Sequence, residues 1–175
     1  MSTVVIPDPS LVLLVGAAGA GKSTLAARLF APDEIVSSDA LRAMVSGDEA
    51  DQSVSGVAFR ILHRTVDRRL AQGLLTVVDS TNAAPTLRRP LLQRARLHGV
   101  RVIAIVLDLD PHTVRVQNAT RRRMVDPDVV DRHMAAVRET VDGGRLALEG
   151  VDQVVVLRDS MAAAALVVER RAATD

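Results

Sequence analysis

The chain has 175 residues, of which 48% are apolar and 25% are charged, and its formal net charge at pH 7 is +1. This composition argues against a disordered or fibrous chain and predicts one globular domain. Cysteine is absent, which excludes disulfides, thiolate zinc sites and cysteine nucleophiles and fits a cytoplasmic protein. The sequence contains no secretory signal and no apolar run of about 18 residues, so we expect no membrane partner.

Aromatic and basic residues are distributed unusually. Tyr and Trp are absent and only two Phe occur, which excludes a platform that stacks several bases. All basic residues are Arg except Lys22, and a compact ammonium suits a tight phosphate cradle better than a guanidinium. The four histidines show no metal-ligand spacing, so we interpret them as ordinary surface or half-buried residues. They are His63, His98, His112 and His133.

Short apolar runs alternate with helical stretches along the whole chain. The predicted strands cover residues 11–15, 34–36, 75–78, 100–107 and 153–157. The predicted helices cover residues 22–30, 39–47, 54–72 and 86–98, a segment from an N-cap at Asp110 to the arginines at 121–123, and residues 126–140 and 160–171. Five strands alternating with helices predict an α/β fold with a parallel sheet and helices on both faces.

Residues 16–24 read GAAGAGKST and match the phosphate-binding loop pattern GxxxxGK(S/T). A buried strand precedes the loop and a helix follows it, as the pattern requires. Backbone amides and the helix N-terminus would hold the phosphates, Lys22 would reach the β- and γ-phosphates, and Ser23 would bind Mg²⁺. The predicted ATP-binding residues are Gly16, Ala17, Ala18, Gly19, Ala20, Gly21, Lys22, Ser23 and Thr24.

Other motifs narrow the class of P-loop protein. A Ras-like GTPase needs an Asn-Lys-x-Asp motif, and no lysine besides Lys22 is present to build one. The linker signature of a transporter ATPase is also missing. The remaining class is a compact kinase that uses ATP and a small or polymeric hydroxyl acceptor.

Four segments resemble the P-loop polynucleotide 5′-kinases. They read GAAGAGKSTLA, VSSDALRAMVSGDEADQS, LLTVVDSTN and RRPLLQRA, and the likeness is strongest to the kinase module of bacterial polynucleotide kinase-phosphatase end-healing enzymes. It runs over about residues 11–169. It implies one kinase domain over residues 1–175, with an N-terminal extension at 1–10 and an Arg-bearing helical lid at about 112–142. It also implies ATP, Mg²⁺ and the 5′-hydroxyl end of an oligonucleotide, DNA or RNA, as partners.

The resemblance assigns roles on the acceptor side of the site. Asp39 matches the general base for the 5′-hydroxyl, although an Asp before Ala-Leu-Arg is also a good helix N-cap. Arg42 lies three residues further on the same helical face and would hold the acceptor's phosphate; the alternative is a solvated or ion-paired Arg. Gln52 would contact the acceptor nucleotide, or it is an ordinary loop residue.

Asp79 ends a predicted apolar strand in the manner of a Walker-B carboxylate. It would hold a Mg²⁺-bound water or the Ser23 hydroxyl, unless it only caps the turn that follows. Asn82 would support the same loop.

The lid arginines complete the predicted site. Arg121, Arg122 and Arg123 would bind the nucleotide, and Arg123 would stabilise the transferring phosphoryl group. The chain departs from the family where Gln117 stands in place of an upstream Arg, a role that Arg115 or Arg121 would have to fill. This departure keeps open the alternative of a non-catalytic ATP-binding module. A kinase of a small-molecule hydroxyl is a further alternative, because the same sheet, loop and lid would serve that acceptor.

Overall fold

Strand β2 (Ser10–Gly16) forms the middle of the fold, and all of its residues are buried. Leu11, Leu13 and Val15 pack on one side of the sheet, while Val12 and Leu14 pack on the other, as alternation along a strand requires. Such burial on both faces explains why this segment reads as one continuous apolar run. The computed structural model describes residues 3–49, 51–121 and 124–172.

The main sheet is fully parallel, with the strand order β3-β4-β2-β5-β6. The five strands confirm the predicted ones to within a few residues. Besides β2 they are β3 (Ile35–Ser37), β4 (Thr76–Asp79), β5 (Arg101–Leu107) and β6 (Gln153–Leu157). Because the strands are parallel, the loops that follow them meet at one edge of the sheet.

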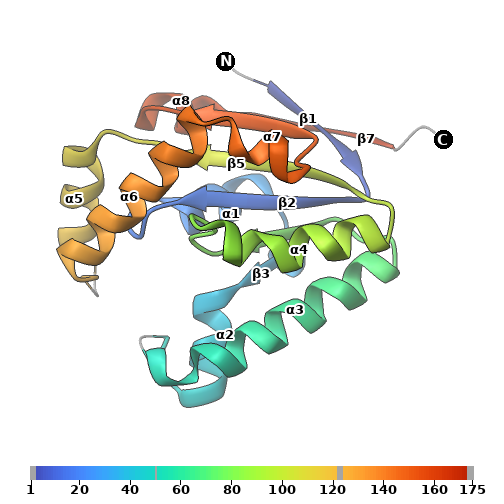
Figure 1. The fold of residues 1–175 in the computed structure, drawn as a ribbon, viewed down its shortest axis with the longest axis horizontal. Helices are drawn as coiled ribbons and strands as arrows, with labels where there is room; N and C mark the ends of the chain where they lie inside the picture. The colour runs from blue at the N-terminus through green and yellow to red at the C-terminus, as the bar shows by residue number, and fades with distance from the viewer. Residues whose placement is uncertain (1–2, 50, 122–123, 173–175) are drawn as a thin grey trace.

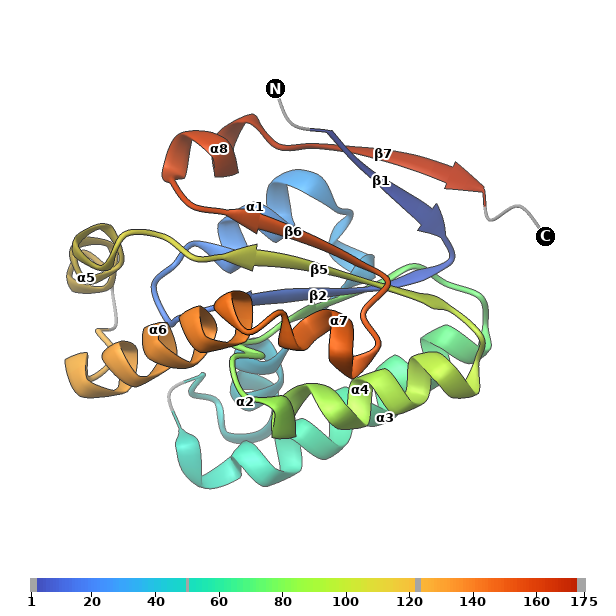
Figure 2. The same ribbon diagram turned by 45° about the horizontal axis from the view of Figure 1, so that its top comes forward.

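Helices cover both faces of this sheet (Figures 1 and 2). One face packs against α2 (Ser38–Ser46), α3 (Ser55–Ala71), α4 (Pro85–Leu97), much of α6 (Pro127–Asp142) and α7 (Arg145–Glu149). The other face packs against α1 (Lys22–Leu29), α5 (Pro111–Ala119), α8 (Ser160–Ala165) and part of α6. Two single-turn 3₁₀ helices, η1 (Pro32–Glu34) and η2 (Gln52–Val54), lie between these elements. The predicted N-cap is confirmed, because the Asp110 carboxylate accepts hydrogen bonds from the first turn of α5.

The predicted final helix over residues 160–171 is wrong in its second half. Helix α8 ends at Ala165, and the chain continues as strand β7 (Val167–Ala172). Strand β7 pairs in parallel with β1 (Thr3–Asp8), within the segment that we had read only as an N-terminal extension. The β-branched pair Val167 and Val168 favours a strand, but the pairing partner lies at the opposite end of the chain. Local sequence therefore could not reveal this two-stranded sheet.

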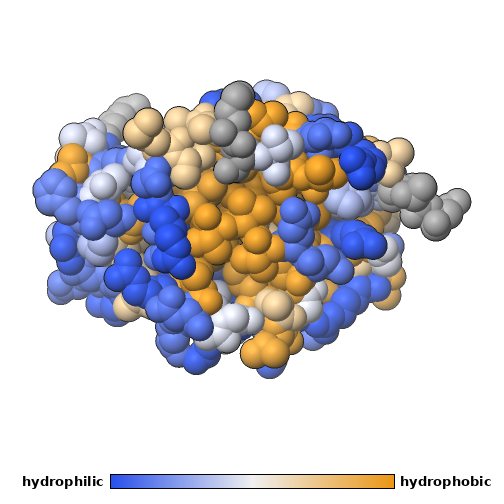
Figure 3. Space-filling model, turned by 90° about the horizontal axis from the view of Figure 1, so that it is seen from above, coloured by the Kyte–Doolittle hydropathy of each residue, from blue (hydrophilic) through white to orange (hydrophobic). Residues whose placement is uncertain are grey.

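The face seen in Figure 3 carries an apolar area in its middle, with hydrophilic side chains around it. Figure 2 shows β6, α8 and β7 on this side of the molecule. Strand β6 is the last strand of its sheet, so its side chains are less covered than those of β2. Among the described residues, no helix has the length and apolar character needed to cross a bilayer.

Candidate nucleotide-binding and phosphoryl-transfer site

The loop between β2 and α1 has the backbone shape of a phosphate cradle. Gly19 and Gly21 both have φ of 87°, a conformation that glycine adopts without steric cost. A Cβ on Gly19 would also lie 3.0 Å from the Cβ of Asn118, so α5 packs directly against this loop. Gly21 is the N-cap of α1, which leaves the first amides of that helix free to bind an anion.

The Lys22 side chain lies inside this loop and is only 8% exposed. Its ammonium donates hydrogen bonds to the carbonyl oxygens of Gly16 (3.0 Å) and Ala17 (2.7 Å). Burial lowers the pKa of Lys22 to about 8, while the negative charges of Asp79 and Asp39 oppose this shift. The ammonium is therefore held in position before any phosphate arrives, with two carboxylates close enough to stabilise its charge.

Ser23 and Asp79 meet at the mouth of the loop. The Ser23 hydroxyl donates a hydrogen bond of 2.7 Å to the Asp79 carboxylate, which joins the start of α1 to the end of β4. Burial raises the pKa of Asp79, against the opposing effects of the Ser23 hydrogen bond and the Lys22 charge. These two side chains offer the hard oxygen atoms that Mg²⁺ prefers, so the donor set fits a Mg²⁺–nucleotide.

Hydrogen bonds join the loop after β4 to the phosphate-binding loop and to β2. The amide of Gly16 donates to the carbonyl oxygen of Thr81 at 3.0 Å. The Asn82 side chain donates to the carbonyl oxygen of Leu14 at 2.8 Å, and its backbone has a φ of 44°, which Asn tolerates better than most residues. These contacts fix Asp79 relative to the phosphate loop.

Asp39 and Arg42 come together on the first turns of α2. Their side chains form an ion pair, and Arg42 also donates to the carbonyl oxygen of Glu49 at 2.8 Å. The helix N-cap is Ser37, whose hydroxyl accepts from the Ala40 amide, so Asp39 does not serve as the cap. The Asp39 side chain remains 44% exposed while that of Arg42 is 9% exposed. A partly exposed carboxylate is therefore oriented by a buried guanidinium.

Gln52 is exposed on η2 and accepts a hydrogen bond of 3.1 Å from the Ser55 hydroxyl. This contact ties it to the start of α3. No described contact joins Gln52 to Asp39 or Arg42, so its assignment to the acceptor stays a prediction.

The segment predicted to form an Arg-bearing lid is only partly described. Arg121 is exposed, yet its charge acts on both Lys22 and Asp79, so it lies near the cradle. Arg122 and Arg123 lie outside the described residues. Arg115 instead forms a two-bond ion pair with Asp131 of α6, at 3.1 and 3.0 Å. Of the two candidates for the missing family Arg, Arg121 is therefore the better placed.

The Asn118 side chain joins α5 to the backbone of Val125, shortly before the start of α6. Its side-chain amide donates to the Val125 carbonyl at 2.7 Å and accepts from the Val125 amide at 3.1 Å. Sequence reasoning missed this role because an Asn in a helix gives no local signal for it.

Sequence reasoning also missed a buried ion pair behind the site. The Arg88 side chain is fully buried and bonds both carboxylate oxygens of Glu149, at 2.7 and 2.5 Å. It also donates to the carbonyl oxygens of Asn82 and Ala83, in the loop that follows Asp79. Helix α4 contains several Arg residues, and nothing in the local sequence distinguishes the buried Arg88 from the others.

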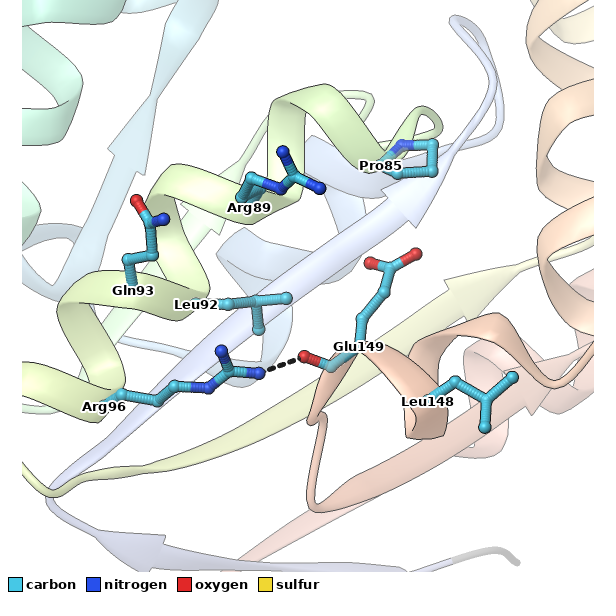
Figure 4. A pocket seen from close by; sticks show the side chains of 7 residues that line it. All are labelled: Pro85, Arg89, Leu92, Gln93, Arg96, Leu148 and Glu149. Carbon is cyan, nitrogen blue, oxygen red and sulfur yellow. Dashed lines mark hydrogen bonds between the residues drawn. The ribbon is translucent and has the colours of Figure 1, made fainter.

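A separate hollow of about 330 Å³ lies between α4 and α7 (Figure 4). Arg89, Leu92 and Arg96 from α4 face Leu148 and Glu149 from α7. Arg96 donates to the Glu149 carbonyl oxygen at 2.5 Å, so this hollow is closed at its base by a contact between the two helices. None of the predicted site residues lines it.

The site thus gathers side chains from several separate segments. An anion cradle with one buried ammonium lies beside an oxygen pair suited to Mg²⁺ and a partly open carboxylate. Within the described residues, no group of three or more His, Cys, Asp and Glu side chains could hold a metal ion without other ligands.

Comparison with known proteins agrees with this geometry. The AAA domain family profile matches residues 11–143. No curated protein matches the chain in sequence. Among solved structures, a chain of the Pnkp1/Rnl/Hen1 RNA repair complex is similar with a TM-score of 0.67 and 18% identity. The match covers 78% of this chain and 46% of that one, so this chain spans less than half of its relative.

Two further structures share the fold. An unliganded sugar kinase from Janibacter sp. HTCC2649 has a TM-score of 0.56 and 21% identity, with 86% of this chain and 85% of that chain covered. The AvrRxo1-ORF1:ORF2 structure with ATP has a TM-score of 0.60 and 17% identity, with 81% and 52% covered. At these identities the likeness shows the fold, a P-loop NTPase-like kinase fold. Since the family profile covers most of its length, the chain belongs to the AAA domain family.

Proposed function

We propose that this protein is an ATP-dependent kinase that phosphorylates the 5′-hydroxyl end of a polynucleotide. The observation that supports the proposal is the partly exposed Asp39 carboxylate at the start of α2, which follows β3 at the edge of the parallel sheet where the phosphate loop also lies. A carboxylate at that position can receive an acceptor hydroxyl beside the γ-phosphate. The Asp39–Arg42 pair gives this carboxylate a defined orientation.

The transfer needs few chemical groups. The Asp39 carboxylate accepts the proton of the acceptor hydroxyl as the hydroxyl oxygen bonds to the γ-phosphorus. The bond from the γ-phosphorus to the bridging oxygen breaks, and ADP leaves with the electron pair. Lys22 and Arg121 stabilise the negative charge that develops on the phosphoryl oxygens. Ser23 and Asp79 would hold Mg²⁺, which neutralises phosphate charge when bound.

A polynucleotide acceptor is supported by the resemblance of the segments SSDALR and DEADQ to polynucleotide kinases. The structural similarity to a chain of an RNA repair complex is consistent with it. With a net charge of +1 and two aromatic residues, the protein should hold only a short end of the strand.

A small-molecule hydroxyl acceptor is the second candidate. Its support is the sugar kinase from Janibacter sp. HTCC2649, which this chain matches over most of the length of both. The cradle and carboxylate would serve either acceptor, because they act only on the phosphoryl group and the attacking hydroxyl.

Transfer of label from γ-labelled ATP separates the candidates. The acceptors are 5′-hydroxyl DNA and RNA oligonucleotides, matched 5′-phosphorylated oligonucleotides as controls, and a panel of sugars and nucleosides. We expect label on the 5′-hydroxyl oligonucleotides alone. Label only on a small acceptor would favour the second candidate, and ATP binding without any transfer would favour a non-catalytic ATP-binding module.

A further inference from the structure

Among the described residues, two buried side-chain polar atoms lack a hydrogen-bond partner, and both belong to helices beside the cradle. They are Oε1 of Gln117 on α5 and Nδ1 of His133 on α6. A buried polar atom without a partner costs about 1–3 kcal/mol, so native structures rarely keep one without a reason. A ligand that enters the neighbouring site is one such reason.

The helix that carries His133 packs against the cradle. Met134 and Val137 of α6 line a small hollow together with Ala17 of the phosphate loop. His133 lies four residues before Val137, so these two residues share one side of the helix. The carbonyl oxygen of Ala17 accepts the 2.7 Å hydrogen bond from the Lys22 ammonium, so α6 packs against a residue that Lys22 contacts.

The charges around His133 favour a neutral ring in the free protein. Burial is the main cause that lowers its pKa below 6.5, and the positive charges of Lys22 on α1 and Arg132 on α6 add to the effect. Asp39, Asp79 and Arg121 surround Lys22 in turn. A bound polyphosphate would offset the Lys22 charge and bring negative charge to the site, which favours the protonated ring.

We propose that His133 is a nucleotide-sensing residue whose imidazole turns when a nucleotide binds, so that the buried Nδ1 donates a hydrogen bond to the polyphosphate with uptake of a proton from solvent. The inference rests on the nucleotide-binding part of the proposed function and does not depend on the acceptor. In this role His133 contacts the nucleotide through a group that is neutral in the free protein and cationic in the complex. Nucleotide affinity then rises as the pH falls.

Calorimetric titration with Mg²⁺–ADP tests this directly. Measurements at pH 7 in two buffers of different ionisation enthalpy give the number of protons taken up on binding. We compare wild type with His133→Asn, which keeps an N–H donor near the Nδ1 position but cannot be protonated. His63→Gln is the matched control, because His63 is also half-buried with a lowered pKa, yet its charged neighbour is Arg94 rather than Lys22.

We expect wild type and His63→Gln to take up a measurable fraction of a proton more than His133→Asn. Between pH 8 and pH 6, the dissociation constant of wild type should fall about three- to sixfold further than that of His133→Asn, the part of the tenfold limit for a pKa difference of about one unit that this pH range covers. With AMP, which lacks the β-phosphate, wild type and His133→Asn should show the same proton uptake and the same pH dependence of the dissociation constant.

Equal proton uptake by wild type and His133→Asn would overturn the inference. A difference that persists with AMP would also overturn it, because the contact would then lie away from the polyphosphate. If His133→Asn fails to fold, the nitrogen-15 and proton shifts of the wild-type imidazole, followed with and without Mg²⁺–ADP, give the same answer. A protein that shows the proton uptake but phosphorylates no oligonucleotide would retain the inference and lose the polynucleotide proposal.

Discussion

Burial of the Lys22 ammonium carries an energetic cost in the free protein, because the charged group loses hydration. Its ammonium is buried, and its two hydrogen bonds and two neighbouring carboxylates restore only part of the lost hydration. Its lowered pKa of about 8 reports that balance. The proposed role in phosphate binding would account for a lysine at a position where its charge is costly to bury.

Replacing Lys22 with alanine should accordingly leave the fold intact and remove transfer. We expect the unfolding temperature to change by only a few degrees and turnover to fall by at least about 10²–10³-fold, the usual loss when one charge-stabilising group is removed. Thermal melting by circular dichroism and the labelled-ATP assay measure the two effects. Lys22→Met, which keeps the aliphatic stem, should behave in the same way, and full activity in either variant would contradict the phosphate-loop assignment.

Asp39 should matter for turnover far more than for ATP binding. In Asp39→Asn the amide can still accept a hydrogen bond from Arg42, but it cannot take the acceptor's proton. We expect kcat to fall about 10²–10⁴-fold and the dissociation constant for ATP to change less than about threefold. Asp33→Asn, which alters an exposed acidic residue on η1, is the control that should match wild type. Equal losses of turnover and ATP affinity in Asp39→Asn would indicate a structural role.

At the scale of elements, α4 and α7 hold the back of the site together through Arg88 and Glu149. The Arg88 guanidinium is fully buried and bonds the carbonyl oxygens of Asn82 and Ala83 as well as the Glu149 carboxylate. The ion pair therefore connects a helix late in the chain to the loop that follows Asp79. Loss of either partner should loosen that loop as well as the helix packing.

Glu149→Ala should destabilise the protein strongly, because it leaves the buried Arg88 charge without its counter-ion. Breaking a buried pair costs about 3–5 kcal/mol of unfolding free energy, measurable by urea denaturation. Glu139→Ala is the matched control: Glu139 pairs with Arg145 across exposed side chains, so its loss should cost less than about 1 kcal/mol. Similar small losses in both variants would show that Glu149 is not needed to compensate Arg88.

Over the whole molecule, the two ends of the chain meet in the β1–β7 pair, outside the residues that the family profile matches. Ile6 and Leu166 are fully buried there against the core that contains α1. Arg170 of β7 forms two hydrogen bonds with Glu34 of η1, at 2.7 and 2.6 Å. These contacts hold the terminal strands against the main sheet and α1.

This ion pair predicts a dependence of stability on acid. The Arg170 guanidinium holds the pKa of Glu34 below 4.5, so the stabilisation is complete above pH 4.5 and is lost as the pH falls through the lowered value. Urea denaturation of Glu34→Gln at pH 7 should show a loss of about 1 kcal/mol, and the difference from wild type should shrink below pH 4. Glu169→Gln, on the exposed side of β7, should match wild type throughout. A difference that does not vary with pH would contradict this explanation.

The sheet, most helices and the phosphate loop could be predicted because each depends on signals within a few residues. The run at 11–15 and the glycines that follow it identify β2 and the cradle, and the spacing of three residues places Asp39 and Arg42 on one helical face. The approach of Asp39 to Lys22 follows from the parallel sheet, since the loops after its strands meet at one edge.

Only the tertiary structure decided which residues far apart in the chain meet. The β1–β7 pairing, the Arg88–Glu149 pair and the packing of α6 against the phosphate loop join distant segments. Local propensity is weak enough that a long-range partner can override it, as where the predicted final helix becomes β7. Burial of an arginine or a histidine likewise depends on what the rest of the chain packs around it, which no short window of sequence contains.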